Sequence, residues 1–395
     1  MIAEQEFIQM NKKEITEIKK QFTPEKTSID RICGCYVDGE KNKRMELAEL
    51  FLTLPEEEVF KYYEIFKKTL SGTIGKNLLN MEFPLEQEMP DGRQHFLMAL
   101  RGSGLKDDVL LEQFYDQVIE NYIYGENYLI LLIHAVYDIP GKSTSNEEMF
   151  DASDEVFDFI LCSICPVNLS KAGLCYNPEK NNIEGRVRDW LIDPPAKGFL
   201  FPAFHDRSTD IHSLLYYSKQ PEVLQEDFIN NVLGCRLPLS AKGQLETFQN
   251  VITETLGDEC DYETVRNLHE NLHELIEEAK ESPDPVELTG RDVKVLLEQS
   301  GAPDEKIQNF EEEFKEIAGE NQTFLASNVA AVRKIHIETP DVVIQVSPER
   351  MDLVETKLID GKKCLVIPVD DYIEVNGIHV LTMKNQEKQT EESEE

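Results

Sequence analysis

The first part of the chain alternates between helical and strand-like patterns of hydrophobic residues. Apolar residues recur every three to four positions in some segments and dominate short β-branched runs in others. The helical segments are residues 11–22, 56–70 and 106–123, and the strand-like segments are residues 28–37 and 45–54. Asp38-Gly39 between the two strands predicts a hairpin turn. Pro55, followed by three glutamates, is typical of a helix start.

Three nearly continuous apolar runs follow, at residues 128–137, 156–164 and 187–204. Strands that are apolar throughout are covered on both faces, so these runs predict a sheet with helices on either side. Residues 221–234 return to a helical pattern. We therefore expect residues 10–235 to form an α/β domain with a mixed sheet and flanking helices.

Residues 236–320 predict a separate, acidic helical subdomain. Four helical segments are divided by glycine and proline, at residues 244–256, 262–280, 289–299 and 303–318. Residues 261–320 hold 18 acidic and 6 basic residues, a net of 6 − 18 = −12. Short helices with short connections are typical of a small bundle whose exposed faces carry the charge.

The C-terminal part, residues 325–382, alternates apolar and polar positions and predicts an antiparallel β subdomain. Asp360-Gly361 and Asn376-Gly377 supply hairpin turns. Residues 383–395 are too polar to fold, and we expect a disordered acidic tail. At the other end, Met10 is followed by a polar, basic sequence typical of a chain start, so residues 1–9 are interpreted as an N-terminal extension. The fold class is α/β (α+β).

The charge balance narrows the classes of partner. With 40 basic and 76 acidic residues the net charge is −36, which repels nucleic acid and anionic membrane surfaces and favours a protein partner, including a basic one. Acidity for solubility alone remains the simpler interpretation. The sequence contains no run of about 18 apolar residues and no signal peptide. Eight dispersed cysteines favour reduced thiols and a cytoplasmic location.

His269-Glu270-Asn271-Leu272-His273 matches the HExxH pattern of zinc hydrolases on a predicted helix. Histidines four residues apart share a helix face and can bind one zinc ion, and Glu270 would serve as the general base. A third ligand is needed, and Glu298 on a neighbouring predicted helix is preferred over Glu287. Zinc is the cofactor under this interpretation.

Several neighbouring residues argue against a zinc site. Arg266 and Glu274 flank the motif with charge, whereas the positions around such motifs are mostly uncharged because the site is buried. The extended version with a further glycine and histidine is absent, since Ile276 and Ala279 occupy those positions. An acidic surface helix with two border histidines is the simpler interpretation, and no cofactor is favoured.

Residues 202–212 form a second candidate site, because His205, Asp206, Arg207 and Asp210 follow an apolar strand. Open α/β sheets bind small ligands at such strand ends. Alternatively, Asp206 caps a helix over residues 211–217 and Arg207 pairs with a surface acid.

The cysteine pairs and the glycine-rich loop carry weaker signals. Cys33 and Cys35 share a face of a predicted strand and either bind a metal or, as we favour, pack as small hydrophobic residues. Cys162 and Cys165 form a C-x-x-C motif without a second one at zinc-site spacing. Residues 71–77 lack the first glycine and the final Ser or Thr of a phosphate-binding loop.

Three stretches resemble a known family: residues 31–39 (RICGCYVDG), 70–79 (LSGTIGKNLL) and 198–204 (GFLFPAF). The chain resembles, over about residues 10–380, a domain of unknown function found in anaerobic Gram-positive bacteria. The resemblance implies a bacterial cytoplasmic protein with one family-wide architecture, and it assigns no catalytic residue.

Three functional interpretations remain open. The favoured one is a non-enzymatic interaction or regulatory protein with an acidic surface. The second is a zinc-dependent hydrolase that uses His269, His273 and Glu298 as ligands and Glu270 as base. The third is small-ligand binding at residues 202–212.

Overall fold

The computed structural model describes residues 9–26, 28–142, 148–149, 155–319, 322–330, 334–369 and 373–380. Residues 1–8 of the predicted N-terminal extension and the predicted tail, residues 383–395, lie outside this part of the chain. The chain divides into two compact units. The first comprises residues 1–248 and 281–287, and the second comprises residues 249–280 and 288–395.

An antiparallel sheet forms the middle of the first unit. Its strands are β1 (Ile29–Val37), β2 (Lys43–Leu50), β3 (Leu78–Glu82), β4 (Tyr128–Ile139), β7 (Glu155–Leu169), β11 (Lys197–Phe201) and β14 (Ser213–Ser218), with β10 (Trp190–Ile192) paired to β7. Their spatial order is β2-β1-β4-β7-β11-β14-β3. The α/β class with flanking helices is confirmed, but the sheet is not the mixed one that was expected, because each pairing between these strands is antiparallel.

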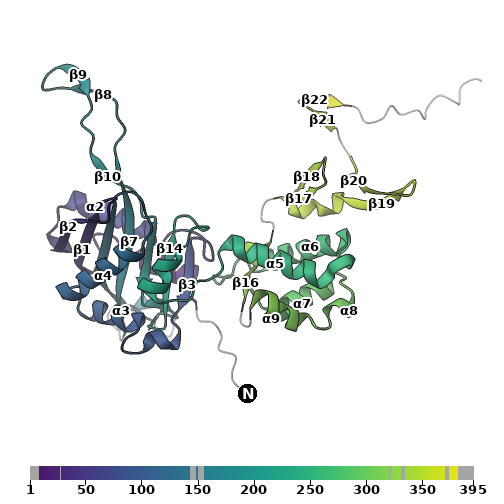
Figure 1. Ribbon diagram of the computed structural model, residues 1–395, viewed down its shortest axis with the longest axis horizontal. Helices are drawn as coiled ribbons and strands as arrows, with labels where there is room; N and C mark the ends of the chain where they lie inside the picture. Colours follow the sequence, from purple (N-terminus) through teal and green to yellow (C-terminus); the bar gives the residue numbers. More distant parts are fainter. Residues whose placement is uncertain are drawn as a thin grey trace, which may run out of the picture. The chain divides into compact units, whose positions relative to one another are not determined.

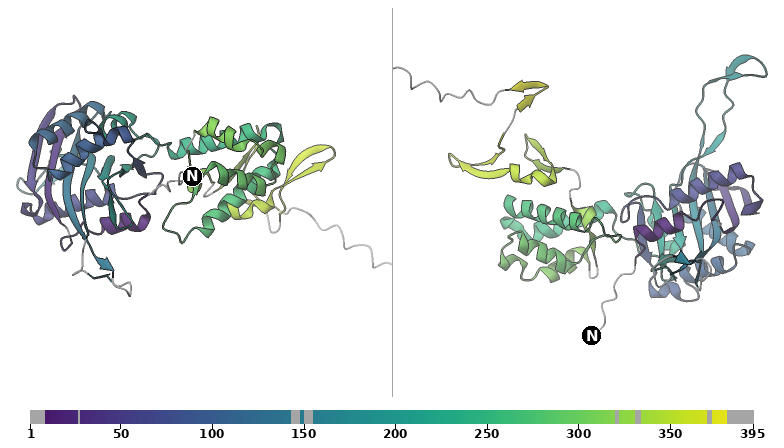
Figure 2. Two further views of the ribbon diagram at one scale, coloured as in Figure 1. Left: turned by 90° about the horizontal axis from the view of Figure 1, so that it is seen from below. Right: turned by 180° about the vertical axis from the view of Figure 1, so that it is seen from behind.

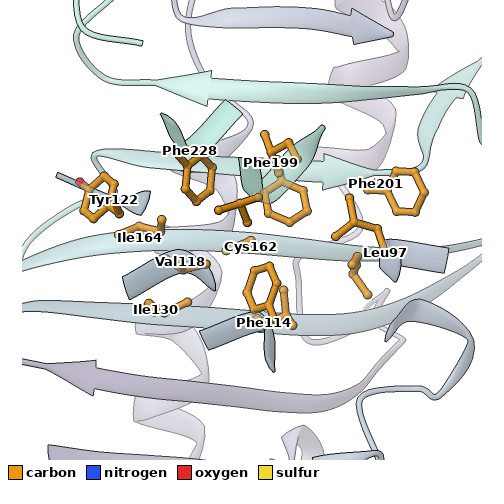
Figure 3. Close-up of a cluster of buried hydrophobic side chains, with 14 of the residues drawn as sticks. Leu97, Phe114, Val118, Tyr122, Ile130, Cys162, Ile164, Phe199, Phe201 and Phe228 are labelled. Carbon is orange, nitrogen blue, oxygen red and sulfur yellow. The ribbon is translucent and has the colours of Figure 1, made fainter. Parts of the chain in front are cut away.

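Helices cover both faces of this sheet (Figure 1). Helices α1 (Lys12–Lys19) and α2 (Glu56–Thr69) lie on one face; α3 (Arg93–Gly102), α4 (Asp108–Asn121) and the π-helical turn η3 (Phe228–Leu233) lie on the other. Successive residues of a strand point to opposite faces, so Ile130 of β4 joins one hydrophobic cluster and Leu131 the other. Figure 3 shows Phe114 and Val118 of α4 against Ile130, Cys162 and Phe199 of the sheet.

Proline accounts for one difference from the sequence-based prediction. The run at residues 187–204, expected as one strand, forms β10, β11 and β12 (Ala203–His205), with Pro194-Pro195 and Pro202 at the breaks. Proline has no N–H to donate to a strand ladder. The helix predicted over residues 221–234 is reduced to η3.

The remaining short elements of the first unit are as follows: η1 (Phe51–Thr53), η2 (Leu85–Glu88), β5 (Gly141–Lys142), β6 (Glu148–Met149), β8 (Leu174–Asn177), β9 (Asn182–Gly185) and β13 (Ser208–Asp210). Strands β8 and β9 form a ribbon that projects well beyond the sheet, as Figure 1 and the right-hand view of Figure 2 both show. The ribbon leaves the sheet after β7 and returns through β10.

Helices dominate the first part of the second unit, as predicted. They are α6 (Tyr262–Glu278), α7 (Gly290–Gln299), α8 (Asp304–Ile307), α9 (Phe310–Ala318) and α10 (Ala326–Val329), while α5 (Ala241–Leu256) runs from the first unit into the second. The short strands β15 (Glu287–Leu288) and β16 (Phe324–Leu325) lie among them. Asp261 caps α6, and Thr289 forms a capping box with Asp292 at α7.

Three separate hairpins follow in place of one larger sheet. They are β17 (Ile335–Glu338) with β18 (Val343–Val346), β19 (Glu355–Ile359) with β20 (Lys362–Val366), and β21 (Ile373–Val375) with β22 (Ile378–Val380); η5 (Pro348–Leu353) connects the first two. Both predicted turns are confirmed, because Asp360-Gly361 and Asn376-Gly377 have the positive φ angles of tight hairpin turns.

Candidate functional site

The two histidines of the HExxH motif lie one turn apart on α6. Leu268 and Leu272 are buried in the helical core, which leaves His269 and His273 half-buried beside them. Burial lowers the pKa of His269, so its ring is neutral at pH 7, the form that binds metals. Its Nδ1 atom is buried and has no hydrogen-bond partner among the described residues.

The other two residues of the predicted zinc site lie apart from these rings. Glu270 pairs with Arg266 one turn earlier, with 3.6 Å between Nε and Oε1. Glu298 is exposed on α7, where it lines a shallow hollow with Lys294 and Asp304. Within the described part of the chain, no group of three or more His, Cys, Asp or Glu side chains is placed to hold a metal ion. The three predicted ligands are therefore not brought together.

The packing of α6 on α7 explains this arrangement. Asparagines rather than histidines face the end of α7: the Asn271 amide donates to Ser300 Oγ at 3.0 Å, and the Asn267 amide donates to the Ser300 carbonyl at 3.3 Å. The helix face that carries the histidines is a different one, because residues 269 and 273 are rotated from 267 and 271 by about 200° around the helix axis.

Residues 205–210 form a tight hairpin rather than a loop that leads into a helix. Asp206 and Arg207 occupy its turn with φ angles of 44° and 57°. The segment that would have been the capped helix, residues 211–217, instead contributes most of β14, which is buried in the sheet and hydrogen-bonded to β11 and β3. The alternative in which Asp206 caps a helix over residues 211–217 is therefore wrong.

The polar groups of this hairpin bind α1. The Asp206 amide donates to Glu14 Oε1 at 2.7 Å, and Arg207 donates to Glu17 Oε1 at 2.9 Å and to the Pro140 carbonyl at 2.8 Å. His205 Nδ1 lies 2.9 Å from the Gln9 carbonyl oxygen. These contacts attach α1 to the sheet and engage the side chains of His205 and Arg207, whereas Asp206 contributes its backbone amide.

Glu14 is the buried centre of this contact. It is 7% exposed and also accepts a hydrogen bond from the backbone N–H of Asn11 at 2.8 Å, which completes the capping box of α1. Desolvation raises the pKa of its carboxyl, although the hydrogen bonds from the Asn11 and Asp206 amides oppose the rise. Asp210, the fourth predicted residue, accepts hydrogen bonds from the His212 amide and the Ser213 hydroxyl.

The cysteines of both pairs are buried thiols. Cys33 and Cys35 lie in the hydrophobic cluster beneath α4, and burial raises the pKa of Cys35 to about 12. Burial also raises the pKa values of Cys162 and Cys165. Thiols in such surroundings stay protonated and behave as small hydrophobic residues. The packing interpretation of Cys33 and Cys35 is confirmed.

Sequence patterns did not indicate a cluster of one histidine and two aspartates across β1, β4 and β7. His134 of β4 is 8% exposed; its Nδ1 lies 3.2 Å from Asp30 Oδ2 and its Nε2 lies 2.7 Å from Asp158 Oδ1. The register of β1 shifts at Asp30, so that this carboxylate reaches the ring. The two carboxylates lie on opposite sides of the imidazole, and they therefore tie three strands together and do not converge on one ion.

The ribbon formed by β8 and β9, with the strand that returns from it, is the other feature that the sequence patterns did not single out. We call residues 170–192 the arm. Its apolar side chains are exposed to solvent rather than buried: Leu174 78%, Tyr176 58%, Ile183 58%, Val187 79%, Trp190 56%, Leu191 49% and Ile192 48%. Tyr176 pairs with Ile183 across the ribbon, and Leu174 lies two residues before Tyr176, so these three share one face.

The charge of the arm differs from that of the rest of the protein. The arm contains four basic residues and three acidic ones, a net of 4 − 3 = +1. The rest of the chain therefore carries −36 − 1 = −37. Lys171 and Arg186 are exposed at the base of the ribbon. An apolar, slightly basic arm on a strongly acidic protein is a surface suited to binding another macromolecule.

The architecture defines a protein with an antiparallel α/β unit that carries a projecting ribbon, followed by a unit of short helices and hairpins. The chain belongs to the family described as a domain of unknown function, DUF4317, whose match covers residues 10–378. This match confirms the resemblance to a domain of unknown function over nearly the whole chain. The comparison with curated proteins found no match. None of the helices in the described residues is long and apolar enough to cross a membrane.

Proposed function

We propose that the protein is a cytoplasmic, non-enzymatic interaction protein that binds a protein partner through the arm. The observation that carries the proposal is the exposed apolar face formed by Leu174, Tyr176 and Ile183. A two-stranded ribbon is marginally stable in water, and it gains stability when a partner covers its apolar face.

The acidity of the protein supports a protein partner over nucleic acid or a membrane. A net charge of −36 repels phosphate groups and anionic lipids. The eight cysteines support the cytoplasmic location, because all eight are free and a reducing compartment maintains that state.

Affinity capture from the organism's own lysate tests the proposal. The tagged wild-type protein is compared with an arm variant, Leu174→Ser/Tyr176→Ser/Ile183→Ser. The matched control is Leu85→Ser/Val109→Ser, because these residues are 80% and 64% exposed in the same unit but lie outside the arm. We expect the arm variant to capture a specific partner in an amount about tenfold or more below that captured by the other two proteins. Equal retention by all three proteins would overturn the proposal.

A further inference from the structure

One edge of the large sheet is open, acidic and partly apolar. Strand β2 is the last strand in the sheet order, so the outward-facing amide and carbonyl groups of its backbone are available to another strand. We call residues 45–60 the acidic edge; they cover most of β2, η1 and the start of α2. Four apolar side chains are exposed there: Met45 48%, Leu50 55%, Leu52 79% and Phe60 46%.

The acidic edge complements the arm in charge. It contains five glutamates, all exposed, while the two basic residues at the start of β2, Lys43 and Arg44, lie outside it and pair with Asp116 and Asp38. The arm carries exposed Lys171 and Arg186 at the base of its ribbon and has a net charge of +1. Opposite charges around two exposed apolar surfaces promote association and set its orientation.

We propose that the partner of the arm is a second copy of this chain, and that the arm of each copy binds the acidic edge of the other. The inference rests on the proposed function of the arm. A strand of the ribbon would extend the sheet beyond β2 by backbone hydrogen bonds, while the apolar residues of the two surfaces cover one another. Two such contacts related by a two-fold axis close a symmetric dimer.

The size of the two surfaces fits a stable contact. The arm has 23 residues and the acidic edge has 16. A symmetric dimer contains both contacts, so each copy offers up to 23 + 16 = 39 residues, of which some, such as Phe51, are buried within the fold. Stable interfaces of standard size use about 20–30 residues from each partner.

A charge exchange between the two surfaces gives the sharpest test. The edge variant, Glu46→Lys/Glu49→Lys, changes the charge of the acidic edge from −5 to −5 + 4 = −1 and places two lysines on β2 against the basic residues of the arm. The arm-charge variant, Lys171→Glu/Arg186→Glu, meets an acidic edge with an acidic arm. Each variant alone should dimerise about tenfold more weakly than the wild type, because like charges face one another. In an equimolar mixture, one contact pairs the two unsubstituted surfaces and the other pairs the new lysines of the edge with the new glutamates of the arm, so the mixture should regain an affinity within about threefold of the wild-type value.

Sedimentation velocity over about 0.1 to about 100 µM protein measures the association. The matched control is Glu311→Lys/Glu312→Lys, which makes the same charge change at exposed positions of α9 and should dimerise like the wild type. Circular dichroism confirms that each variant folds.

The chain has a single tryptophan, and Trp190 lies in the arm at 56% exposure. Its fluorescence should therefore shift to shorter wavelength as the dimer forms.

The outcomes separate this inference from the proposed function. A wild-type protein that stays monomeric over the whole range, or variants that dimerise equally well alone and mixed, would overturn the dimer. If the dimer fails while the arm variant still loses its partner in the lysate, the arm binds a different protein and the proposed function stands. If both experiments show no effect of the arm, both proposals fail.

Discussion

Lys197 is a lysine buried in the sheet without a carboxylate partner among the described residues. It is 4% exposed, and its ammonium group donates to Ser218 Oγ at 2.6 Å and to the Val223 carbonyl oxygen. Burial lowers the pKa of Lys197 to about 8 from its ordinary value of 10.5, because the charged form is poorly solvated there. The folded protein therefore releases this proton at a lower pH than the unfolded chain does.

Replacing the titratable Lys197 side chain should change how the free energy of unfolding depends on pH above 8. Between pH 8 and about 9.5 the unfolded chain binds more protons at Lys197 than the folded protein, so raising the pH favours folding. In the wild type, the free energy of unfolding should rise over this interval relative to Lys197→Met, which cannot titrate. Urea unfolding at several pH values measures the difference. The control, Lys219→Met at an exposed neighbouring position, should keep the wild-type slope, and a shared slope for all three proteins would refute the account.

The HExxH histidines allow a separate test at the residue scale. Because Glu298 is exposed on α7 and Glu270 pairs with Arg266, we expect the purified protein to bind less than one zinc ion per chain. His269→Ala/His273→Ala should contain the same small amount. Elemental analysis of protein purified without added metal measures both. One zinc ion per wild-type chain that is absent from the double variant would establish the hydrolase interpretation instead.

At the scale of elements, the fit between α2 and the sheet depends on Gly198 of β11. A Cβ atom at this position would lie 2.4 Å from the Cys162 carbonyl oxygen and 2.6 Å from Cγ2 of Thr69. Thr69 is the last residue of α2, and its hydroxyl lies 2.6 Å from that of Ser163 on β7. The absence of a side chain at Gly198 therefore allows the end of the helix to approach two strands closely.

Gly198→Ala should force these elements apart. Overpacking a tight contact of this kind costs about 1–3 kcal/mol of unfolding free energy, and here the close neighbour is backbone that cannot rotate away. Gly125→Ala is the matched control, because its added Cβ atom would meet nothing within 4 Å. Urea denaturation of the three proteins measures the cost. An equal midpoint for Gly198→Ala and the wild type would show that the contact relaxes freely.

Local patterns predicted the elements better than their connections. Proline with acids at the start of α2, and Asp-Gly or Asn-Gly at hairpins, act through local backbone chemistry, so they could be recognised without the fold. The antiparallel order of the sheet depends on pairings between distant segments, which a single sequence does not reveal. The Asp30–His134–Asp158 cluster was missed for the same reason, since its three residues come from three strands. The arm was missed because its apolar residues have the composition of buried strands, and exposure is a tertiary property.

At the scale of the whole molecule, the net negative charge opposes folding, whereas the opposite charges of the arm and the acidic edge favour association. The net charge of −36 produces self-repulsion that destabilises the folded chain, and salt screens it. The contact proposed between the arm and the acidic edge is attractive, and the same screening weakens it. The screening length falls from about 10 Å at 0.1 M to about 3 Å at 1 M.

Sodium chloride should therefore stabilise the fold while it weakens the dimer. From about 0.1 to about 1 M salt, the free energy of unfolding should rise for protein studied at concentrations where it is monomeric, and the dissociation constant of the dimer should rise as well. Glu311→Lys/Glu312→Lys reduces the net charge by four units to −32, so its unfolding free energy should respond less to salt, while its dissociation constant should follow the wild-type trend. Chemical denaturation measures the first quantity and sedimentation the second. If salt strengthened the dimer, the repulsion between two copies of net charge −36 would outweigh the attraction between the arm and the acidic edge, and the proposed charge contact would not drive association.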